Sequence, residues 1–229
     1  MSSGEMFLVK AVIFDMYETL ITQYKCPLYF GKQIAIDAGI DEEKFCEPWS
    51  AAEEDRTVGK ITLEEILERI LKENGCYSEK KLSYIVNKRI KCKEEAFKHI
   101  HSEIIPMLKS LKEKGISIGL ISNCFSEESA VIKNSILYPF FDVACLSFDM
   151  GIQKPNKAIF KSCIEKLNLQ PDECLYVGDG GSCELETAKS VGMKAVQAVW
   201  YINEVTEHPS KIKSDFEKVE TPLRILDIL

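Results

Sequence analysis

Short apolar runs that alternate with stretches of helical periodicity are the feature that most constrains the fold of this chain. The apolar runs, rich in valine and isoleucine, lie at residues 9–14, 116–121, 143–146, 175–177 and 194–199. Runs of this kind are typical of strands buried on both faces of a sheet. Amphipathic stretches at residues 127–136, 157–167 and 184–191 separate the later runs. This alternation predicts an α/β fold with a Rossmann-like parallel sheet.

Residues 22–100 form a long helical insert between the first two predicted strands, too long for a single crossover connection. Within the insert, Thr62 and Glu65 have the spacing of a capping box ahead of an apolar helix face. We therefore predict two parts: an α/β core formed by residues 1–21 and 101–229, and an all-helical cap subdomain at residues 22–100. An insert at this position would cover the ends of the strands as a lid does.

The charge pattern argues against nucleic acid as a partner. The net charge is −7, and lysines and arginines are interleaved with acidic residues instead of forming a basic block. With 45% hydrophobic residues in 229, the chain has enough apolar material for one large domain, or for a core with a smaller insert. The composition therefore favours a globular protein that is not disordered.

The cysteines and the N-terminal residues favour a cytoplasmic location. Nine cysteines are an odd number and include no Cys-x-x-Cys pair, which is typical of reduced thiols. The first residues lack the basic segment and long apolar segment of a secretory signal. No apolar stretch reaches membrane-spanning length, so we expect no membrane association.

Polar residues stand where the predicted strands end. Asp15, Ser122 and Asp179 each follow a strand, and Lys154 lies in the loop after the third strand. In open α/β sheets, ligand-binding groups gather beyond the carboxyl ends of the strands. The topology alone therefore predicts that two carboxylates, a hydroxyl group and an ammonium group converge.

This set of groups suits nucleophilic catalysis assisted by a metal ion. A carboxylate beside a lysine and a serine can attack an electrophile whose developing negative charge those residues stabilise. Two aspartates held close together repel each other, and a divalent cation such as Mg²⁺ between Asp15 and Asp179 would relieve the repulsion.

The same residues lie in four short motifs. The motifs are Phe-Asp-Met-Tyr-Glu-Thr-Leu at residues 14–20, Ile-Ser-Asn at 121–123, Lys154-Pro155, and Val-Gly-Asp-Gly-Gly-Ser-Cys-Glu at 177–184. In this order, and over essentially the whole chain, they resemble the motifs of the haloacid dehalogenase superfamily.

The resemblance implies a role for each residue at the reacting group. Asp15 would be the nucleophile that becomes esterified, and Thr19 would support its loop. Ser122 would bind the transferred group, with Asn123 beside it. Lys154 would neutralise the nucleophile and the incoming group.

The resemblance also implies a metal site and a mobile cap. Asp15 and Asp179 would bind Mg²⁺, Glu184 would hold it through water, and the main-chain carbonyl of Tyr17 would complete the site. The helical insert is similar to the cap of the family, which excludes water and selects the substrate.

Tyr17 is the main departure from the phosphatases of this family. Most of them have an aspartate two residues after the nucleophile, which protonates the leaving alkoxide and later activates water. Glu18 is one position further on and, if the chain is still extended there, points to the opposite side. Tyrosine at this position resembles the 2-haloacid dehalogenases, but those enzymes need no metal and usually have a tyrosine where this chain has Phe160.

Two further residues are candidates for substrate binding. Tyr17 would form an aromatic wall of the pocket. Arg56, in the insert just before Gly59, would contact an anionic group of the substrate, although a solvated surface arginine is the alternative interpretation.

We interpret the chain as a Mg²⁺-dependent phosphatase of a small phosphorylated metabolite, which reacts through an aspartyl-phosphate at Asp15. The retained acidic residues favour this reading, because they are costly beside Asp15 unless a cation is bound. The first alternative is a metal-independent 2-haloacid dehalogenase. The second is a binding or regulatory protein that keeps the fold but has lost efficient turnover.

Overall fold

A single parallel sheet forms the centre of the computed structural model, which describes residues 8–206 and 208–229. Among these residues, six strands pair in the order β3-β2-β1-β4-β5-β6, each parallel to its neighbours. The strands are β1 Ala11–Phe14, β2 Ser117–Ser122, β3 Val143–Leu146, β4 Cys174–Gly178, β5 Lys194–Ala198 and β6 Glu217–Val219. The predicted α/β fold is confirmed. The sequence pattern does not predict β6, because this edge strand has only three residues, two of them exposed.

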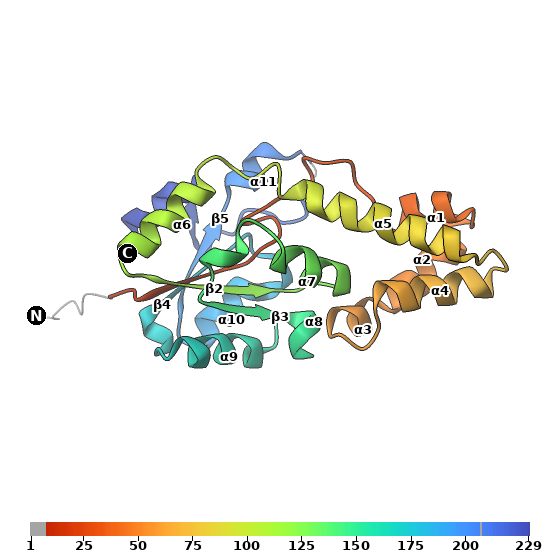
Figure 1. The fold of residues 1–229 in the computed structure, drawn as a ribbon. Helices are drawn as coiled ribbons and strands as arrows, with labels where there is room; N and C mark the ends of the chain where they lie inside the picture. The colour runs from red at the N-terminus through yellow and green to blue at the C-terminus, as the bar shows by residue number, and fades with distance from the viewer. Residues whose placement is uncertain (1–7, 207) are drawn as a thin grey trace, which may run out of the picture.

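Helices cover both faces of the sheet (Figure 1). In β1, Val12 and Phe14 belong to the apolar cluster that includes α6 (Ile104–Glu113) and α7 (Ser126–Lys133). Ala11 and Ile13 point the other way, into the cluster that includes α9 (Lys157–Leu167) and α10 (Glu184–Ser190). Alternate side chains of a strand face opposite sides, so a strand apolar at every position needs cover on both sides. The helices after the insert are α6 Ile104–Glu113, α7 Ser126–Lys133, α8 Ser147–Met150, α9 Lys157–Leu167, α10 Glu184–Ser190 and α11 Trp200–Glu204.

Short 3-10 turns complete the core after β2. They are η1 Tyr138–Phe140, η2 Pro171–Glu173, η3 Gly181–Cys183 and η4 Pro222–Asp227.

The chain between β1 and α6 is helical, as the sequence predicts. Its helices are α1 Gly31–Ala38, α2 Glu42–Ala51, α3 Glu53–Thr57, α4 Leu63–Glu73 and α5 Glu79–Ala96. They lie to one side of the sheet (Figure 1) and share an apolar cluster of their own, which includes Phe45, Leu67 and Ile85. The division into a core and a cap at residues 22–100 stays a prediction.

The capping box predicted at the start of α4 is present. The Thr62 hydroxyl accepts a hydrogen bond from the Glu65 main-chain N–H at 3.3 Å, and Glu65 Oε2 accepts one from the Thr62 N–H at 2.7 Å. Two of the donors that a helix start leaves free are thereby satisfied, which fixes where α4 begins.

The helical insert contacts the core at α8. Gly59 has a φ of +73°, and a Cβ atom at this position would lie 2.2 Å from the main-chain oxygen of Phe148. Nearby, the N–H of Leu63 donates a hydrogen bond to Ser126 Oγ at 3.0 Å. Only glycine allows this close approach of two backbones.

Among the described helices, none combines the length and the apolar character that a bilayer crossing requires. All nine cysteines, which lie within the described residues, are free thiols.

Replacing Gly59 by alanine should test the contact between the insert and the core. Gly75 has a similar φ of +66° but open space around it, so Gly75→Ala is the matched control. We expect Gly75→Ala to lower the free energy of unfolding by about 1 kcal/mol through backbone strain alone. Gly59→Ala should lose about 1–3 kcal/mol more through overpacking, measured by urea denaturation. Equal losses in the two variants would contradict the contact.

Candidate active site

The nucleophile candidate and a second aspartate meet at the centre of the sheet. Asp15 directly follows β1, Asp179 directly follows β4, and these two strands are neighbours. The chain order runs outward to one side from β1 to β3 and to the other side from β4 to β6, which makes the gap between β1 and β4 the switch point where ligands bind in such sheets. Both carboxylates are buried, each 5% exposed.

Lys154 supplies the positive charge of the site. Its buried ammonium Nζ lies 2.5 Å from Asp15 Oδ1 and 2.5 Å from Glu184 Oε2. Burial alone would lower the pKa of Lys154, but the two carboxylates outweigh burial and raise that pKa above its ordinary value. Asn123 fixes the lysine backbone: it accepts from the Lys154 N–H at 2.8 Å and donates to the Lys154 carbonyl at 3.0 Å.

Asp15, Asp179 and Glu184 form a buried group whose ligand oxygens all lie within 4.8 Å of one another. Burial raises the pKa of Asp15 to about 7, with Lys154 opposing and Glu184 adding to the shift. Burial, then Glu184 and Asp15, raise the pKa of Asp179 well above its ordinary value. Three carboxylates therefore share the one positive charge of Lys154, and their oxygen donors are those that Mg²⁺ prefers. The predicted metal ligands with side-chain donors thus fit a divalent cation.

Glu184 reaches the site because Gly178 leaves room for it. A Cβ atom on Gly178 would lie 2.1 Å from Glu184 Oε1. The same oxygen accepts a hydrogen bond from the Gly180 N–H at 3.2 Å. Tyr176 donates its hydroxyl to Glu184 Oε2 at 2.9 Å and also lies 3.4 Å from Lys154 Nζ.

Tyr176 is a site residue that our sequence analysis missed. Its signal was a tyrosine inside an otherwise apolar strand, since a buried phenol hydroxyl needs a polar partner. Its ring packs on Phe160, with centroids 5.3 Å apart. Phe160 therefore supports the tyrosine that contacts Lys154.

The loop after the nucleophile is held at several points. Thr19 donates its hydroxyl to Asp15 Oδ2 at 3.3 Å, and the Thr19 carbonyl accepts from the Trp200 indole N–H at 2.8 Å. Ser122, which is fully buried, donates to the Asn123 carbonyl at 3.3 Å. The structure thus brings Thr19, Ser122 and Asn123 to the same end of the sheet as Asp15.

Tyr17 and Glu18 adopt different environments. Tyr17 lines a large cavity between the insert and the core. Its hydroxyl is buried without a hydrogen-bond partner among the described residues. Burial, followed by the charge of Glu128, raises the pKa of this phenol well above its ordinary value. Glu18 has a φ of 63°, so the premise that the chain is extended there is wrong. Its carboxylate accepts from Thr22 at 2.5 Å and from the Gln23 N–H at 3.0 Å.

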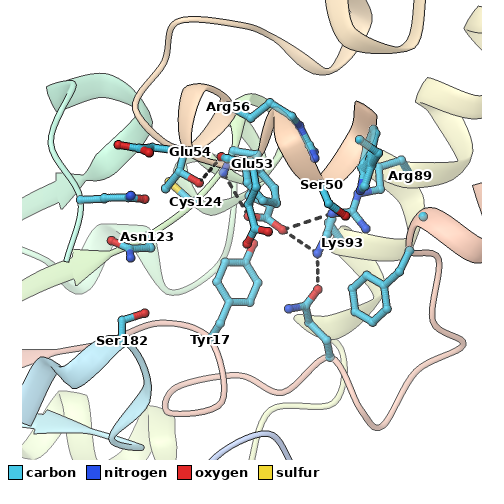
Figure 2. Close-up of a pocket in the computed structure, with 18 of the residues that line it drawn as sticks. Tyr17, Ser50, Glu53, Glu54, Arg56, Arg89, Lys93, Asn123, Cys124 and Ser182 are labelled. Carbon is cyan, nitrogen blue, oxygen red and sulfur yellow. Dashed lines mark hydrogen bonds and ion pairs between the residues drawn. The ribbon is translucent and has the colours of Figure 1, made fainter. Parts of the chain in front are cut away.

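A cavity of about 960 Å³ lies between the insert and the core (Figure 2). Tyr17, Asn123 and Lys154 line it from the core. Figure 2 shows the Tyr17 hydroxyl directed toward the side where Arg56 and Lys93 of the insert lie. The cavity therefore connects the nucleophile end of the site with the insert.

Buried charges join the insert to the core on the wall of this cavity. Arg89 and Lys93 of α5 face Glu127 and Glu128 of α7. Arg89 Nε lies 3.1 Å from Glu127 Oε1, and Lys93 Nζ lies 2.5 Å from Glu128 Oε1. Lys93 also donates to the side chain of Gln23. The sequence does not predict these ion pairs, because a charged helix face looks solvated until its partner helix is known.

Arg56 is buried, 1% exposed, and is not a solvated surface side chain. Its guanidinium carbon lies 3.7 Å from the ring centroid of Trp49 and 4.0 Å from that of Phe125. Its Nη2 is 3.6 Å from Glu127 Oε1, yet Nε and Nη2 have no hydrogen-bond partner among the described residues. Burial lowers the pKa of Arg56 to about 10, against the opposing effect of Glu127.

Comparison with known proteins identifies a family. A family model described as haloacid dehalogenase-like hydrolase matches residues 9–192. The chain is 26% identical over 200 residues to the glyceraldehyde 3-phosphate phosphatase of Methanopyrus kandleri, covering 83% of this chain and 84% of that protein. Matches to several other curated relatives span less than half of those proteins.

Solved structures share the fold. The 2-haloacid dehalogenase from Pseudomonas syringae pv. tomato superposes with a TM-score of 0.68 at 18% identity, covering 96% of this chain and 98% of that one. A haloacid dehalogenase family enzyme from Bacteroides thetaiotaomicron, in complex with magnesium and inorganic phosphate, superposes with a TM-score of 0.62 at 21% identity, covering 83% and 94%. At these identities the likeness concerns the fold alone.

Proposed function

We propose that this chain, which belongs to the haloacid dehalogenase-like hydrolases, is a Mg²⁺-dependent phosphatase of small phosphorylated metabolites. The observation that carries the proposal is the charge of the buried site. Asp15, Asp179 and Glu184 form a buried group of three carboxylates, and among the described residues one ammonium group, that of Lys154, pairs with two of them, Asp15 and Glu184. Such an excess of buried negative charge is costly unless a cation is bound. The phosphatase activity named for the relative from Methanopyrus kandleri supports the same reading.

The reaction would use Asp15 as a covalent nucleophile. A carboxylate oxygen of Asp15 attacks the phosphorus atom, the bond from phosphorus to the ester oxygen breaks, and the bonding pair leaves with the alcohol oxygen. Water then attacks the aspartyl-phosphate, which releases inorganic phosphate and restores Asp15. Lys154 stabilises the charge on the transferred group, which Ser122 and Asn123 would bind.

The cation would be held by Asp15, Asp179 and the main-chain carbonyl of Tyr17, and by Glu184 through water. When bound, Mg²⁺ neutralises the carboxylates and the phosphoryl oxygens. The family enzyme from Bacteroides thetaiotaomicron, with its magnesium and phosphate, supports Mg²⁺ as the cation. A substrate that fills the cavity between insert and core would displace water from the site during the first step.

Metal removal and Asp15→Asn test the proposal together. We expect hydrolysis of p-nitrophenyl phosphate to stop when EDTA removes the metal and to return with Mg²⁺. Asp15→Asn should lose activity by at least about a thousandfold, because the amide keeps the shape but not the nucleophile. Circular dichroism should show an unchanged fold. Phosphatase activity that survives either change would contradict the mechanism.

Tyr17 favours a second candidate function, a metal-independent 2-haloacid dehalogenase. In that reaction Asp15 attacks carbon and a halide leaves, which needs no proton from residue 17. Assays with 2-haloacids, run with and without EDTA, separate the two functions. Dehalogenation that is indifferent to metal, without phosphatase activity, would replace our proposal. Absence of any turnover would favour the binding or regulatory alternative.

The leaving group should control the rate, because residue 17 offers no carboxylic acid to protonate the departing oxygen. General acid catalysis contributes roughly a hundred- to ten-thousandfold, so alkyl phosphates should react slower than aryl phosphates by a large factor. Tyr17→Asp should narrow this gap by accelerating alkyl phosphates selectively. The measurement is kcat/KM for phosphates of graded leaving-group pKa in both proteins. A wild-type rate that is the same across the series would refute this role of Tyr17.

The proposal extends to a second anionic group on the substrate, which Arg56 would bind. On the cavity wall three cations, Arg56, Arg89 and Lys93, lie near the paired carboxylates Glu127 and Glu128, and Glu53 and Glu54 also line the cavity. Arg89 and Lys93 have their partners, which leaves Arg56 with free N–H groups on a planar guanidinium. Two free donors of this geometry suit a carboxylate.

3-Phosphoglycerate and glycerol 3-phosphate form a matched pair of probes, which differ in a carboxylate against a hydroxymethyl group. We expect Arg56→Met to raise KM for 3-phosphoglycerate by roughly ten- to a hundredfold, the worth of a charged hydrogen bond. KM for glycerol 3-phosphate should hardly change. Arg69→Met, at an exposed arginine of α4, is the control. Equal effects on both probes would rule out carboxylate binding by Arg56.

A further inference from the structure

A segment near the C-terminus, residues 208–213, contacts the proposed metal site. Ser210 donates its hydroxyl to Asp179 Oδ2 at 2.6 Å. The other oxygen of the same carboxylate, Oδ1, accepts from the Gly181 N–H at 3.0 Å. Both oxygens of Asp179 thus have a donor, which fixes the plane of the carboxylate.

Gln197 anchors the segment to Asp179. This fully buried side chain at the end of β5 donates through Nε2 to the Asp179 carbonyl at 2.8 Å and to the Lys211 carbonyl at 2.9 Å. Its Oε1 accepts from the Lys213 N–H at 2.8 Å. A buried amide must have partners, and here each of them lies either on Asp179 or on the segment.

The segment packs closely on the glycine loop after β4. Gly180 has a φ of +94°, and a Cβ atom there would lie 2.9 Å from Lys213 Cε and 3.2 Å from Gln197 Nε2. Lys213 Nζ forms an ion pair with Glu186 Oε1 of α10 at 2.5 Å. The segment is therefore held directly after Ser210, at Lys211 and Lys213, so the hydroxyl is presented to Asp179 in a defined position.

We infer that Ser210 is a positioning residue for Mg²⁺, which holds the Asp179 carboxylate in the orientation that binds the cation. The inference rests on the proposed function, because it assumes that Asp179 is a metal ligand. Without the hydroxyl, the negative charges of Asp15 and Glu184 push the Asp179 carboxylate away from the shared position. The family model ends at residue 192, so Ser210 and Gln197 are contributed by a part of the chain outside the matched region.

The test compares Mg²⁺ binding, measured by calorimetry, in the wild type and three variants of the full chain. Loss of a hydrogen bond to a metal ligand typically weakens binding by about ten- to a hundredfold, which we expect for Ser210→Ala. Ser210→Thr keeps the hydroxyl and should bind within about threefold of the wild type. Ser214→Ala removes an exposed hydroxyl four residues further along the chain, which donates to Asp215. This control variant should bind Mg²⁺ as the wild type does.

Kinetics distinguish a positioning role of Ser210 from a merely structural one, because a structural role would not change the Mg²⁺ dependence of the activity. The Mg²⁺ concentration for half-maximal phosphatase activity should rise in Ser210→Ala by the factor seen in calorimetry. At saturating Mg²⁺, kcat should return to near the wild-type value, and the melting temperature in EDTA should be unchanged.

The outcomes separate the inference from the function on which it rests. Wild-type affinity in Ser210→Ala, or equal weakening in Ser210→Thr or Ser214→Ala, overturns the positioning role and leaves the phosphatase proposal standing. A wild-type protein that does not bind Mg²⁺ overturns both.

Discussion

The ion pairs of Lys154 are the interaction on which the rest of the site depends. One ammonium group lies between Asp15 and Glu184, and Asp179 lies within reach of both carboxylates. A buried lysine and three buried carboxylates are stable together only if the backbone holds each one in place. Asn123 fixes the lysine through two hydrogen bonds, and the absence of a side chain at Gly178 admits Glu184. The order of the strands then sets the geometry, because β1 and β4 end side by side.

The two ends of the cavity differ in how their charges are compensated. Near Asp15, negative charge is in excess. At the other end, Arg89 and Lys93 pair with Glu127 and Glu128, and Arg56 keeps two N–H groups without a hydrogen-bond partner among the described residues. A substrate that spans the cavity would place its phosphoryl group at the bound cation and a second anionic group at Arg56. The insert contributes Arg56, Arg89 and Lys93, and the core contributes their carboxylate partners. A movement of the insert away from the core would break these ion pairs. The pairing of charges on the cavity wall therefore depends on the position of the insert.

The sequence predicted those parts of the structure that depend on local pattern and on chain order. Apolar runs located the strands from β1 to β5, and the rule that ligand groups follow parallel strands brought Asp15, Lys154 and Asp179 together. What the sequence missed depends on long-range packing. Ser210 lies 31 residues from Asp179 in the chain, and no local pattern links the two. The ion pairs between α5 and α7 require knowledge of which helices face each other, and the left-handed backbone at Glu18 depends on the loop that holds its carboxylate.

The tyrosine at position 17 is consistent with the charges that surround it. Its hydroxyl is buried on the cavity wall, and the carboxylate of Glu128 is the largest charge effect on it after burial. An aspartate there would add another buried carboxylate near Glu128, two residues along the chain from Asp15, whose group already has an excess of negative charge. A neutral phenol avoids that repulsion while it fills the wall with an aromatic ring. Burial and the nearby Glu128 thus favour a neutral side chain at position 17, although Arg89 opposes the effect of Glu128.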